Sequence, residues 1–495
     1  MQDRALLISP AYDASVYTSA ESLGLRSVAA ALAVEGADVR IVEQCPPEAP
    51  SPVNEWAWGA RLIGIGVLFT RQIPAALELT ASLRSVAPAA HIVLGGQGVQ
   101  FLWQRVLQDC PALDSVCLYE GEQTVGELWH ALRERKSFGT IKGLAHRRGG
   151  TVIAEPRPPV TDLDALPFPH REPGPYPSGL ATVSTSRGCM AHCTFCQSGN
   201  YGNRYHRLPK WRARSAANIA AELTNLIREH QITAVSFVDD DFFGGDGQGN
   251  ERAYELARLL HTLPGGIHFS IECRINELDE PLFQALRAAG LRRVLIGIEA
   301  ANEADLALFA KKTTNAQAAR AISSLRSLDI DFSLGFIMFQ PLSSLDAIGE
   351  NLTFLHRHRV AAHRQLVNRL ELYPAAPLTR YFQRKGVELR EEGYRIEYEF
   401  SDPAVTLLRR AFMEVLKPYI RVERACQAAL FQAVTHGQGE SSRRLREHAA
   451  DICEALSSHA LKCWERVAAD SDPGQDPALK SEVSEEVRRL TATIS

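Results

Sequence analysis

Short apolar segments alternate with helix-like segments in two separate series along this chain of 495 residues. The first series lies within residues 1–145 and the second within residues 181–400. Short, continuously apolar strands separated by helices are typical of parallel sheets that are covered on both faces. The pattern therefore predicts two α/β units, and a chain of this length normally divides into more than one domain.

The first series predicts an open α/β domain over residues 1–145. We expect a doubly wound, Rossmann-like sheet with helices on both faces. Its expected segments are strands at 5–9, 38–43, 62–69 and 91–96 and helices at 25–36 and 73–86. Ligands of such sheets bind beyond the carboxyl ends of the strands, which here lie near Ser9-Pro10 and Gly95-Gly96.

The second series predicts a partial (β/α)6 TIM-type barrel over residues 181–400. Its expected strands lie at residues 181–186, 234–241, 267–274, 292–300, 331–339 and 365–374. A proline-rich stretch precedes it and predicts a linker over residues 146–180, because proline neither continues a helix nor pairs within a central strand. Only helical patterns remain after the barrel, so residues 401–495 are expected to form a helical domain.

Charge and composition restrict the partners. The formal net charge of −4 gives no reason to expect a nucleic-acid partner. The first residues lack the pattern of a secretory signal peptide, and no apolar run reaches the roughly 18 residues of a membrane-spanning helix. Ten cysteines are too few for a disulfide scaffold of this size. We therefore expect a cytoplasmic protein with a small-molecule substrate and no membrane partner.

Three cysteines lie close together in the loop after the first strand of the second series. Cys189, Cys193 and Cys196 form the pattern C-x3-C-x2-C. Structural zinc needs four ligands, usually from two paired motifs, whereas an iron–sulfur cube held by three thiolates leaves one iron open to another ligand. Zinc with His192 as the fourth ligand and three incidental buried cysteines are the alternatives. The other seven cysteines are scattered singly, as core residues commonly are.

The cysteine motif, with the aromatic Phe195 before its last cysteine, resembles the signature of radical S-adenosylmethionine (SAM) enzymes. The resemblance covers residues 181–375 and includes the segments SRGC (186–189), RARS (212–215), FVDDDFF (237–243), GIEA (297–300) and YPAAPL (373–378). It implies a [4Fe-4S] cluster whose open iron is chelated by the amino and carboxylate groups of SAM. Reductive cleavage of SAM then yields a 5'-deoxyadenosyl radical that removes hydrogen from an unactivated carbon.

The resemblance also implies which residues hold SAM. Asp239 and Asp240 are expected at the methionine amino group, Glu272 and Arg274 at the ribose and carboxylate, Glu299 near the nucleoside, and Phe195 with its backbone against the adenine. Acidic residues after strands also cap helices, so capping is the alternative for each acidic residue. The basic stretch 204–214, with Arg212 and Arg214, could attract an anionic substrate, but we expect it to be a solvated charged face.

The first series resembles the cobalamin-binding domain of B12-dependent radical SAM enzymes. The general form of that domain carries D-x-H-x-x-G, then S-x-L, then GG, and the segments SAESLG (19–24), GVL (66–68) and Gly95-Gly96 fall at these places. Ser19 and Glu21 replace the aspartate and the histidine, so any cobalamin would be bound without a histidine ligand. The segment YEGEQT (119–124) also resembles the closing G-E-G-E-x-T of such domains. The implied cobalamin-binding residues are Gly24, Gly66, Leu68, Gly95, Gly96, Glu120 and Gly121. A domain without cobalamin that serves as a cap or substrate platform is the alternative.

Together the two resemblances imply cobalamin-dependent C-methylation of a natural-product intermediate. One SAM would supply the methyl group through cobalamin, a second would supply the radical, and a flavodoxin or ferredoxin would supply electrons. The alternative is a cobalamin-independent dehydratase, deoxygenase or epimerase that acts on a sugar-like substrate. Methylthiolation of transfer RNA is disfavoured because Cys45, Cys110 and Cys117 lack the spacing of a second cluster. A non-enzymatic iron–sulfur sensor is a further alternative.

Overall fold

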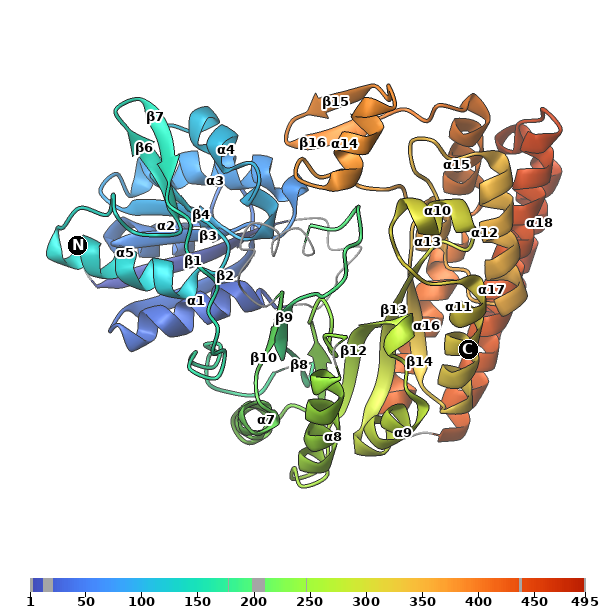
Figure 1. Ribbon diagram of the computed structural model, residues 1–495, viewed down its shortest axis with the longest axis horizontal. Helices are drawn as coiled ribbons and strands as arrows, with labels where there is room; N and C mark the ends of the chain where they lie inside the picture. The colour runs from blue at the N-terminus through green and yellow to red at the C-terminus, as the bar shows by residue number, and fades with distance from the viewer. Residues whose placement is uncertain are drawn as a thin grey trace.

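Two sheets built mainly of parallel strands lie side by side, and a layer of long helices covers the far side of the second sheet (Figure 1). The computed structural model describes residues 3–11, 21–176, 178–197, 210–245, 247–435 and 439–493. The first sheet belongs to the N-terminal part of the chain, and the second belongs to the barrel region. The expected α/β class with a helical C-terminus is confirmed.

The first sheet has seven strands in the order β2-β1-β3-β4-β5-β6-β7. The five parallel strands are β1 (Arg4–Pro10), β2 (Asp38–Cys45), β3 (Leu62–Gly66), β4 (His91–Gly95) and β5 (Ser115–Cys117). This order is that of a doubly wound sheet whose switch point lies between β1 and β3, where ligands commonly bind. The antiparallel strands β6 (Leu144–Arg148) and β7 (Thr151–Ala154) extend the sheet past residue 145, into the region that we expected to be linker.

Helices cover both faces of this sheet. The helices are α1 (Leu23–Val34), α2 (Ser51–Gly59), α3 (Ile73–Val86), α4 (Trp103–Asp109) and α5 (Glu122–Glu134). One apolar core lies under α2, α3 and α4, and a second lies under α1 and α5. The strands read as continuous apolar runs because both of their faces are buried in this way.

The second sheet has five parallel strands in the order β14-β13-β12-β11-β8. They are β8 (Leu180–Val183), β11 (Ala234–Phe237), β12 (His268–Arg274), β13 (Leu291–Glu299) and β14 (Asp331–Phe336). The intervening helices are α7 (Ala216–His230), α8 (Gln248–Leu260), α9 (Glu280–Ala289), α10 (Glu303–Leu308), α11 (Asn315–Ser327) and α12 (Leu345–His358). Several begin at a capping side chain, as where Ser215 accepts a hydrogen bond from the backbone N–H of Asn218.

The expected sixth barrel strand at residues 365–374 is wrong in its extent. The first part of that segment forms the short helix α13 (His363–Val367). The rest meets the barrel through an isolated bridge between Phe339 and Arg369 and a hydrogen bond from the Asn368 side chain to the Phe336 carbonyl at 2.6 Å. Leu370 and Leu372 are instead buried in a separate apolar cluster with α10 and α14 (Pro377–Arg384). The described part of the barrel therefore has five paired strands.

The barrel strands present one apolar and one polar face. Phe269, Ile271 and Cys273 of β12 are buried in the core under the helices, whereas the alternate positions keep partial exposure on the inner face. The register places Arg274 opposite Gly297 and Gly297 opposite Gly335 near the carboxyl ends of the strands. The Glu299 side chain lies over these two glycines, at the level where ligands of such barrels bind.

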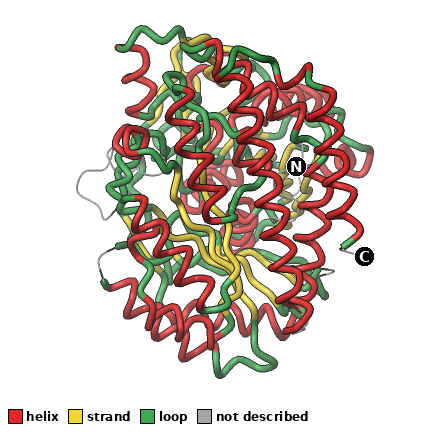
Figure 2. Tube along the Cα trace, turned by 90° about the vertical axis from the view of Figure 1, so that its right-hand side faces the viewer, coloured by secondary structure: helices red, strands yellow, loops and turns green. Residues whose placement is uncertain are grey.

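The C-terminal helices lie on the right-hand side of the molecule in Figure 1, and Figure 2 views the molecule from that side, with helices in front of the strands. They are α15 (Pro403–Val415), α16 (Tyr419–Thr435), α17 (Gly439–Ala468) and α18 (Pro477–Ala492). Arg446 of α17 donates to Asp331 at the start of β14 at 2.5 Å, and apolar side chains of all four helices belong to the barrel core. In the part of the chain that the structure describes, no helix is long and apolar enough to cross a membrane.

Candidate functional site

The cysteine loop follows β8 at the carboxyl-terminal edge of the barrel. A short ribbon flanks it, formed by β9 (Ser186–Gly188) and β10 (Trp211–Ala213). At the centre of the loop, the Thr194 backbone N–H donates to the carbonyl of Phe309 at 3.1 Å, and its hydroxyl donates to the carbonyl of Leu308 at 2.6 Å. The backbone N–H of Leu378 donates to the Thr194 carbonyl at 3.0 Å. The loop is therefore tied to the end of α10 and the start of α14.

The three cysteines of the loop form no disulfide and are partly exposed, whereas most of the other cysteines are buried. Burial raises the pKa values of Cys189 and Cys193, and Cys196 raises both further, so Cys196 lies within electrostatic range of each of them. Among the described residues no three Cys, His, Asp or Glu side chains converge on a single-ion site. A cube spreads its thiolates over three irons, so the donor set fits a [4Fe-4S] cluster.

His192 does not lie with the thiols as a fourth ligand. Both of its ring nitrogens lie near the Lys210 ammonium, at 3.1 Å for Nδ1 and 3.0 Å for Nε2. The positive charge of Lys210 lowers the pKa of the exposed imidazole. The structure therefore gives no support to the zinc alternative.

Asp239 is buried beneath the loop, where it holds the backbone of the first barrel turn. Its carboxylate accepts hydrogen bonds from the backbone N–H groups of Thr185 and Ser186, each at 2.7 Å, and from the Thr185 hydroxyl at 2.7 Å. Only 2% of the residue is exposed, and burial raises the pKa of its carboxyl. Asp239 thus positions the backbone that leads into the loop, and its expected contact with the methionine amino group of SAM stays a prediction.

Asp240 and Glu272 lie closer to the barrel interior. Asp240 is exposed at the end of β11, and the half-buried Glu272 lies on the inner face of β12. Burial and the nearby Asp240 raise the pKa of Glu272 to about 7. The two carboxyl groups are thus within electrostatic range, and both remain candidates for SAM contact.

The next aspartate, Asp241, approaches a cluster ligand, and the sequence analysis had not singled it out. The Cys189 thiol donates to its Oδ2 at 3.4 Å, and the backbone N–H of Gly244 donates to Oδ1 at 3.1 Å. Sequence alone could not distinguish the three aspartates in a row, because only the bend after β11 decides which one faces the cysteine.

Arg274 offers the strongest feature for binding the SAM carboxylate. Its Nε is buried and lacks a hydrogen-bond partner among the described residues, and its charge lowers the pKa of Cys193. A buried guanidinium nitrogen without a partner is costly unless a ligand accepts its hydrogen bond. The predicted contact of Arg274 with SAM therefore fits the structure.

Glu299 lies at the end of β13 with its backbone in the left-handed region, at φ 70°. Its carboxylate pairs with the buried Lys311 at 3.3 Å and lies over Gly297 and Gly335, where added Cβ atoms would come within 2.7 and 3.4 Å of its oxygens. Glu299 also raises the pKa of Cys193, so it lies within electrostatic range of the cluster loop, and its expected place near the nucleoside stays a prediction. Lys311 is a partner that the sequence analysis did not identify.

Phe195 packs with the apolar cluster beside the loop. Its ring meets Phe309 edge to face, with ring centroids 5.4 Å apart. This packing holds the ring beside α10, and the predicted backbone contact with adenine stays a prediction.

Glycines line the carboxyl-terminal edge of the first sheet, where cobalamin is expected. Gly96 has φ 103°, and a Cβ there would overlap the carbonyl oxygen of Val67. A Cβ at Gly66 would come within 2.8 Å of Leu25, whereas one at Gly95 would make only ordinary contacts. Leu68 stands 51% exposed at the same edge. A close-packed glycine turn with an exposed apolar side chain fits a large, flat ligand.

Glu21, which replaces the cobalt-binding histidine, takes part in contacts with the barrel. Its carboxylate accepts the Thr182 backbone N–H at 2.8 Å and the Tyr176 hydroxyl at 2.9 Å, and it pairs with Arg26 at 2.8 Å and Arg171 at 3.3 Å. Burial opposes its ionisation, but Arg171 and the other donors outweigh it and lower the pKa. Glu21 is thus unavailable to cobalt, as the sequence suggested.

Of two further positions of the segment SAESLG (19–24), the structure describes Gly24 but not Ser19. A Cβ at Gly24 would meet no atom within 4 Å, so Gly24 faces open space at the start of α1. Ser19 lies outside the described residues. The cobalamin contacts predicted for the glycines and Leu68 stay predictions.

Glu120 and the arginines after the cysteine loop have roles that the sequence analysis did not predict. Glu120, expected at cobalamin, pairs with Arg212 at 2.6 Å, and Arg214 pairs with Glu222 at 2.5 Å. Arg212 and Arg214 are buried, so the expectation of a solvated charged face is wrong at these two positions. Residues 204–209 of that stretch lie outside the described residues.

Gly121, also expected at cobalamin, packs closely against α1, because a Cβ there would come within 3.1 Å of Val28.

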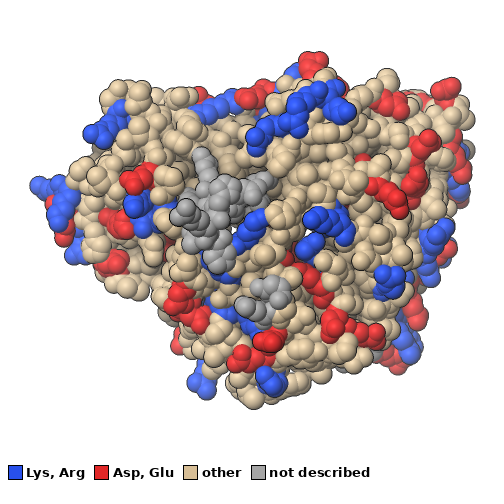
Figure 3. All heavy atoms as spheres, in the orientation of Figure 1, with Lys and Arg blue, Asp and Glu red and all other residues tan. Residues whose placement is uncertain are grey.

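Acidic and basic side chains are interspersed over the face seen in Figure 3, which agrees with the small net charge.

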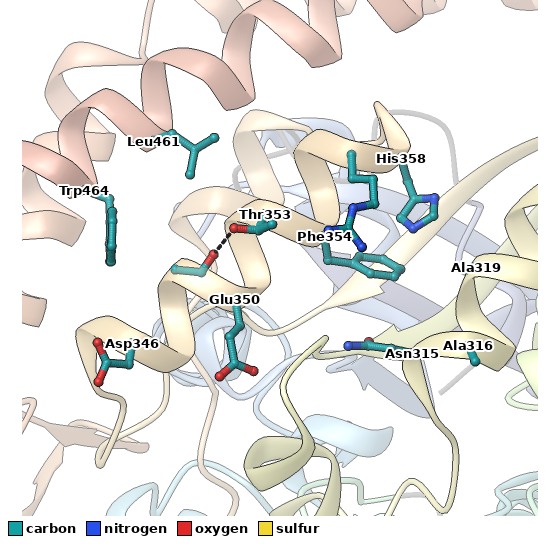
Figure 4. A pocket seen from close by; sticks show the side chains of 12 residues that line it. Asn315, Ala316, Ala319, Asp346, Glu350, Thr353, Phe354, His358, Leu461 and Trp464 are labelled. Carbon is teal, nitrogen blue, oxygen red and sulfur yellow. Dashed lines mark hydrogen bonds between the residues drawn. The ribbon is translucent and has the colours of Figure 1, made fainter.

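A pocket of about 580 Å³ opens on the outer side of the barrel region, between α11, α12 and α17. Trp464, Glu350 and Phe354 line this pocket (Figure 4), and none of the predicted site residues does. This pocket is therefore separate from the candidate site, which lies at the barrel edge that carries the cysteine loop.

Two family models match the chain. A model described as the radical SAM superfamily matches residues 183–355, and a B12 binding domain matches residues 10–129. The chain is 28% identical over 279 residues to an uncharacterized methyltransferase of Pyrococcus horikoshii, covering 55% of this chain and 59% of that protein. It is 25% identical over 397 residues to the cytidylyl-2-hydroxyethylphosphonate methyltransferase of Streptomyces wedmorensis, covering 72% of this chain and 70% of that protein. The chain thus spans less than two thirds of the first of these relatives.

Solved structures share the fold over most of the chain. The cobalamin-dependent SAM radical enzyme OxsB with aqua-cobalamin bound is similar at a TM-score of 0.76 and 18% identity, covering 99% of this chain and 80% of that one. The radical SAM methyltransferase TsrM of Kitasatospora setae, with cobalamin and a [4Fe-4S] cluster bound, is similar at 0.71 and 16% identity, covering 90% and 100%. The family matches imply a [4Fe-4S] cluster, SAM and cobalamin as cofactors. The chain therefore combines a B12-binding domain with a radical SAM domain that covers most of its barrel.

Proposed function

We propose that this protein is a cobalamin-dependent radical SAM enzyme that methylates an unactivated carbon of a small molecule. The observation that carries the proposal is the way in which the two sheets meet. Glu120, just after β5, pairs with Arg212 beside the cysteine loop. Thr70, just after β3, donates to Glu371, near the end of the barrel, at 3.0 Å. The ligand-binding edge of the B12-binding domain therefore faces the SAM-binding edge of the barrel.

This arrangement suits chemistry that needs two cofactors at one substrate. When bound, the cluster supplies the electron that cleaves SAM, and cobalamin supplies a methyl group for transfer. The chain's own residues bind and orient: Arg274 offers a guanidinium to the SAM carboxylate, Glu299 lies beside Cys193, and Asp239 holds the turn that leads into the cysteine loop.

The substrate class is proposed from chemistry and from the names of relatives. Carbons without acidic protons require radical chemistry, and such steps are common in the assembly of natural products. Two relatives are described as a hopanoid C-3 methylase and a 4'-phospho-dehydrooxetanocin synthase, both named for small molecules. We propose a natural-product intermediate as the substrate. A flavodoxin or ferredoxin would serve as reductant, and cysteines that form no disulfide suit a cytoplasmic location.

Isotope-labelled SAM tests the proposed reaction. Anaerobic, reconstituted protein with dithionite and methyl-deuterated SAM should form 5'-deoxyadenosine and transfer label to a small molecule from extracts of the source organism, both read by mass spectrometry. Cys193→Ala should do neither. Formation of 5'-deoxyadenosine with an unlabelled product would contradict methylation, and it would indicate a radical rearrangement instead.

A further inference from the structure

The cysteine loop leaves and rejoins the fold through a two-stranded ribbon. In this ribbon Arg187 of β9 lies directly opposite Arg212 of β10, and Gly188 lies opposite Trp211. Gly188 immediately precedes the ligand Cys189, and it has φ 87°, where a Cβ would overlap the carbonyl oxygen of Lys210. The close approach of the two strands therefore determines the position of Cys189, the first cluster ligand.

Two like charges face each other across this ribbon. Cross-strand pairs of equal charge are destabilising, and partial burial increases the repulsion. The side chain of Arg212 is only 6% exposed and that of Arg187 only 25%. The ribbon thus needs negative charge from outside itself to stay closed.

The B12-binding domain supplies that charge. Glu122 pairs with Arg187 at 2.5 Å, and Glu120 pairs with Arg212 at 2.6 Å and with Arg187 at 3.5 Å. Burial opposes ionisation of Glu122, but Arg187 outweighs it and lowers the pKa of that carboxyl. Glu122 also begins α5, where the helix dipole favours a negative charge. Glu120 additionally accepts the backbone N–H of Val160 at 2.8 Å.

We propose that Glu120 and Glu122 are positioning residues for the [4Fe-4S] cluster. They neutralise the facing arginines, hold the ribbon closed and so fix the start of the cysteine loop from the neighbouring domain. The B12-binding domain therefore supports the cluster as well as facing it. This inference rests on the proposed function only in that the loop must carry a cluster.

Cluster stability in the full chain tests the role. In Glu120→Gln/Glu122→Gln, the reconstituted cluster should bleach about tenfold faster under an iron chelator, because loss of supporting contacts typically costs 10- to 100-fold in metal affinity. The spectrum of the reduced cluster by electron paramagnetic resonance should also change. Glu127→Gln is the matched control, since Glu127 lies on the same helix and pairs with Arg157 at 2.5 Å without touching the ribbon.

A charge exchange separates positioning from general damage to the fold. Glu122→Arg/Arg187→Glu restores an opposite-charge pair, so its cluster should bleach more slowly than that of the double glutamine variant. An exchange that brings no recovery would contradict the proposal, as would bleaching of the double variant at the rate of Glu127→Gln. Wild-type protein that holds no iron would overturn the proposed function itself, and iron-loaded wild type with an unaffected double variant would overturn only this inference.

Discussion

At the scale of single residues, the three loop cysteines differ from the others because they lie together in one short loop. Cys193→Ala should abolish both cluster assembly and SAM cleavage, because a cube with two remaining thiolates loses one of its three anchors. Cys453→Ala should change neither, since Cys453 lies on α17 in the C-terminal helical layer. Iron content and 5'-deoxyadenosine formation measure the two effects. Cleavage retained by Cys193→Ala would refute the assignment.

Two glycines of the B12-binding domain should respond oppositely to alanine. Gly96→Ala places a Cβ against the Val67 carbonyl at a left-handed backbone and should lower the free energy of unfolding by about 1–3 kcal/mol. Gly24→Ala fills open space in a helix and should raise it by up to about 1 kcal/mol. Urea unfolding of both variants measures the difference. Equal stability of the two variants would contradict the backbone geometry described for Gly96.

At the scale of elements, the inner face of β12 predicts a dependence of stability on pH. The pKa of Glu272 is raised from 4.5 to about 7, first by burial and then by Asp240 and Asp239. The folded chain therefore holds a proton that the unfolded chain has released, so stability is greatest below pH 4.5 for this group and falls as pH rises towards 7. Glu272→Gln should flatten this part of the profile. Unchanged slopes in urea unfolding between pH 5 and 7.5 would contradict it.

Most strands of both sheets could be predicted, because a strand buried on both faces reads as a short apolar run between helices. Helix α2 and strands β5–β7 were not predicted, since short elements of mixed polarity carry little periodic signal. The sixth barrel strand was overpredicted because Leu370 and Leu372 look like strand residues but pack with α10 and α14.

Part of the candidate site could likewise be predicted from the sequence, and part could not. The cysteine motif is local in sequence, so its three ligands could be recognised directly. Which aspartate of residues 239–241 supports the loop backbone depends on a bend that the sequence does not reveal. Glu120 pairs with Arg212, 92 positions away, and Glu122 pairs with Arg187, 65 positions away. No spacing rule in the sequence connects such distant residues.

At the scale of the whole molecule, buried charges join the two domains. Besides the ribbon contacts, Glu21 links to Arg171, which pairs with Glu222 at 3.0 Å, and Glu222 pairs with Arg214. Glu21→Gln should cost roughly 3 kcal/mol of unfolding free energy, because breaking a buried charge pair leaves a charge uncompensated. It should also speed proteolysis of the segment between the domains.

Glu35→Gln is the control for this variant. Glu35 belongs to the same domain and pairs with His130 at 2.5 Å near the surface, away from the barrel. Its unfolding free energy and proteolysis rate should stay close to those of the wild type. Equal behaviour of the two variants would mean that Glu21 does not hold the domains together.

The metal content of anaerobically prepared protein supplied with cobalamin tests the central claim most directly. A cube on three thiolates and a filled B12-binding domain predict about four irons and one cobalt per chain. Four irons without cobalt would contradict cobalamin-dependent methylation and leave a radical SAM enzyme with an empty first domain. Protein without iron would contradict the assignment of Cys189, Cys193 and Cys196.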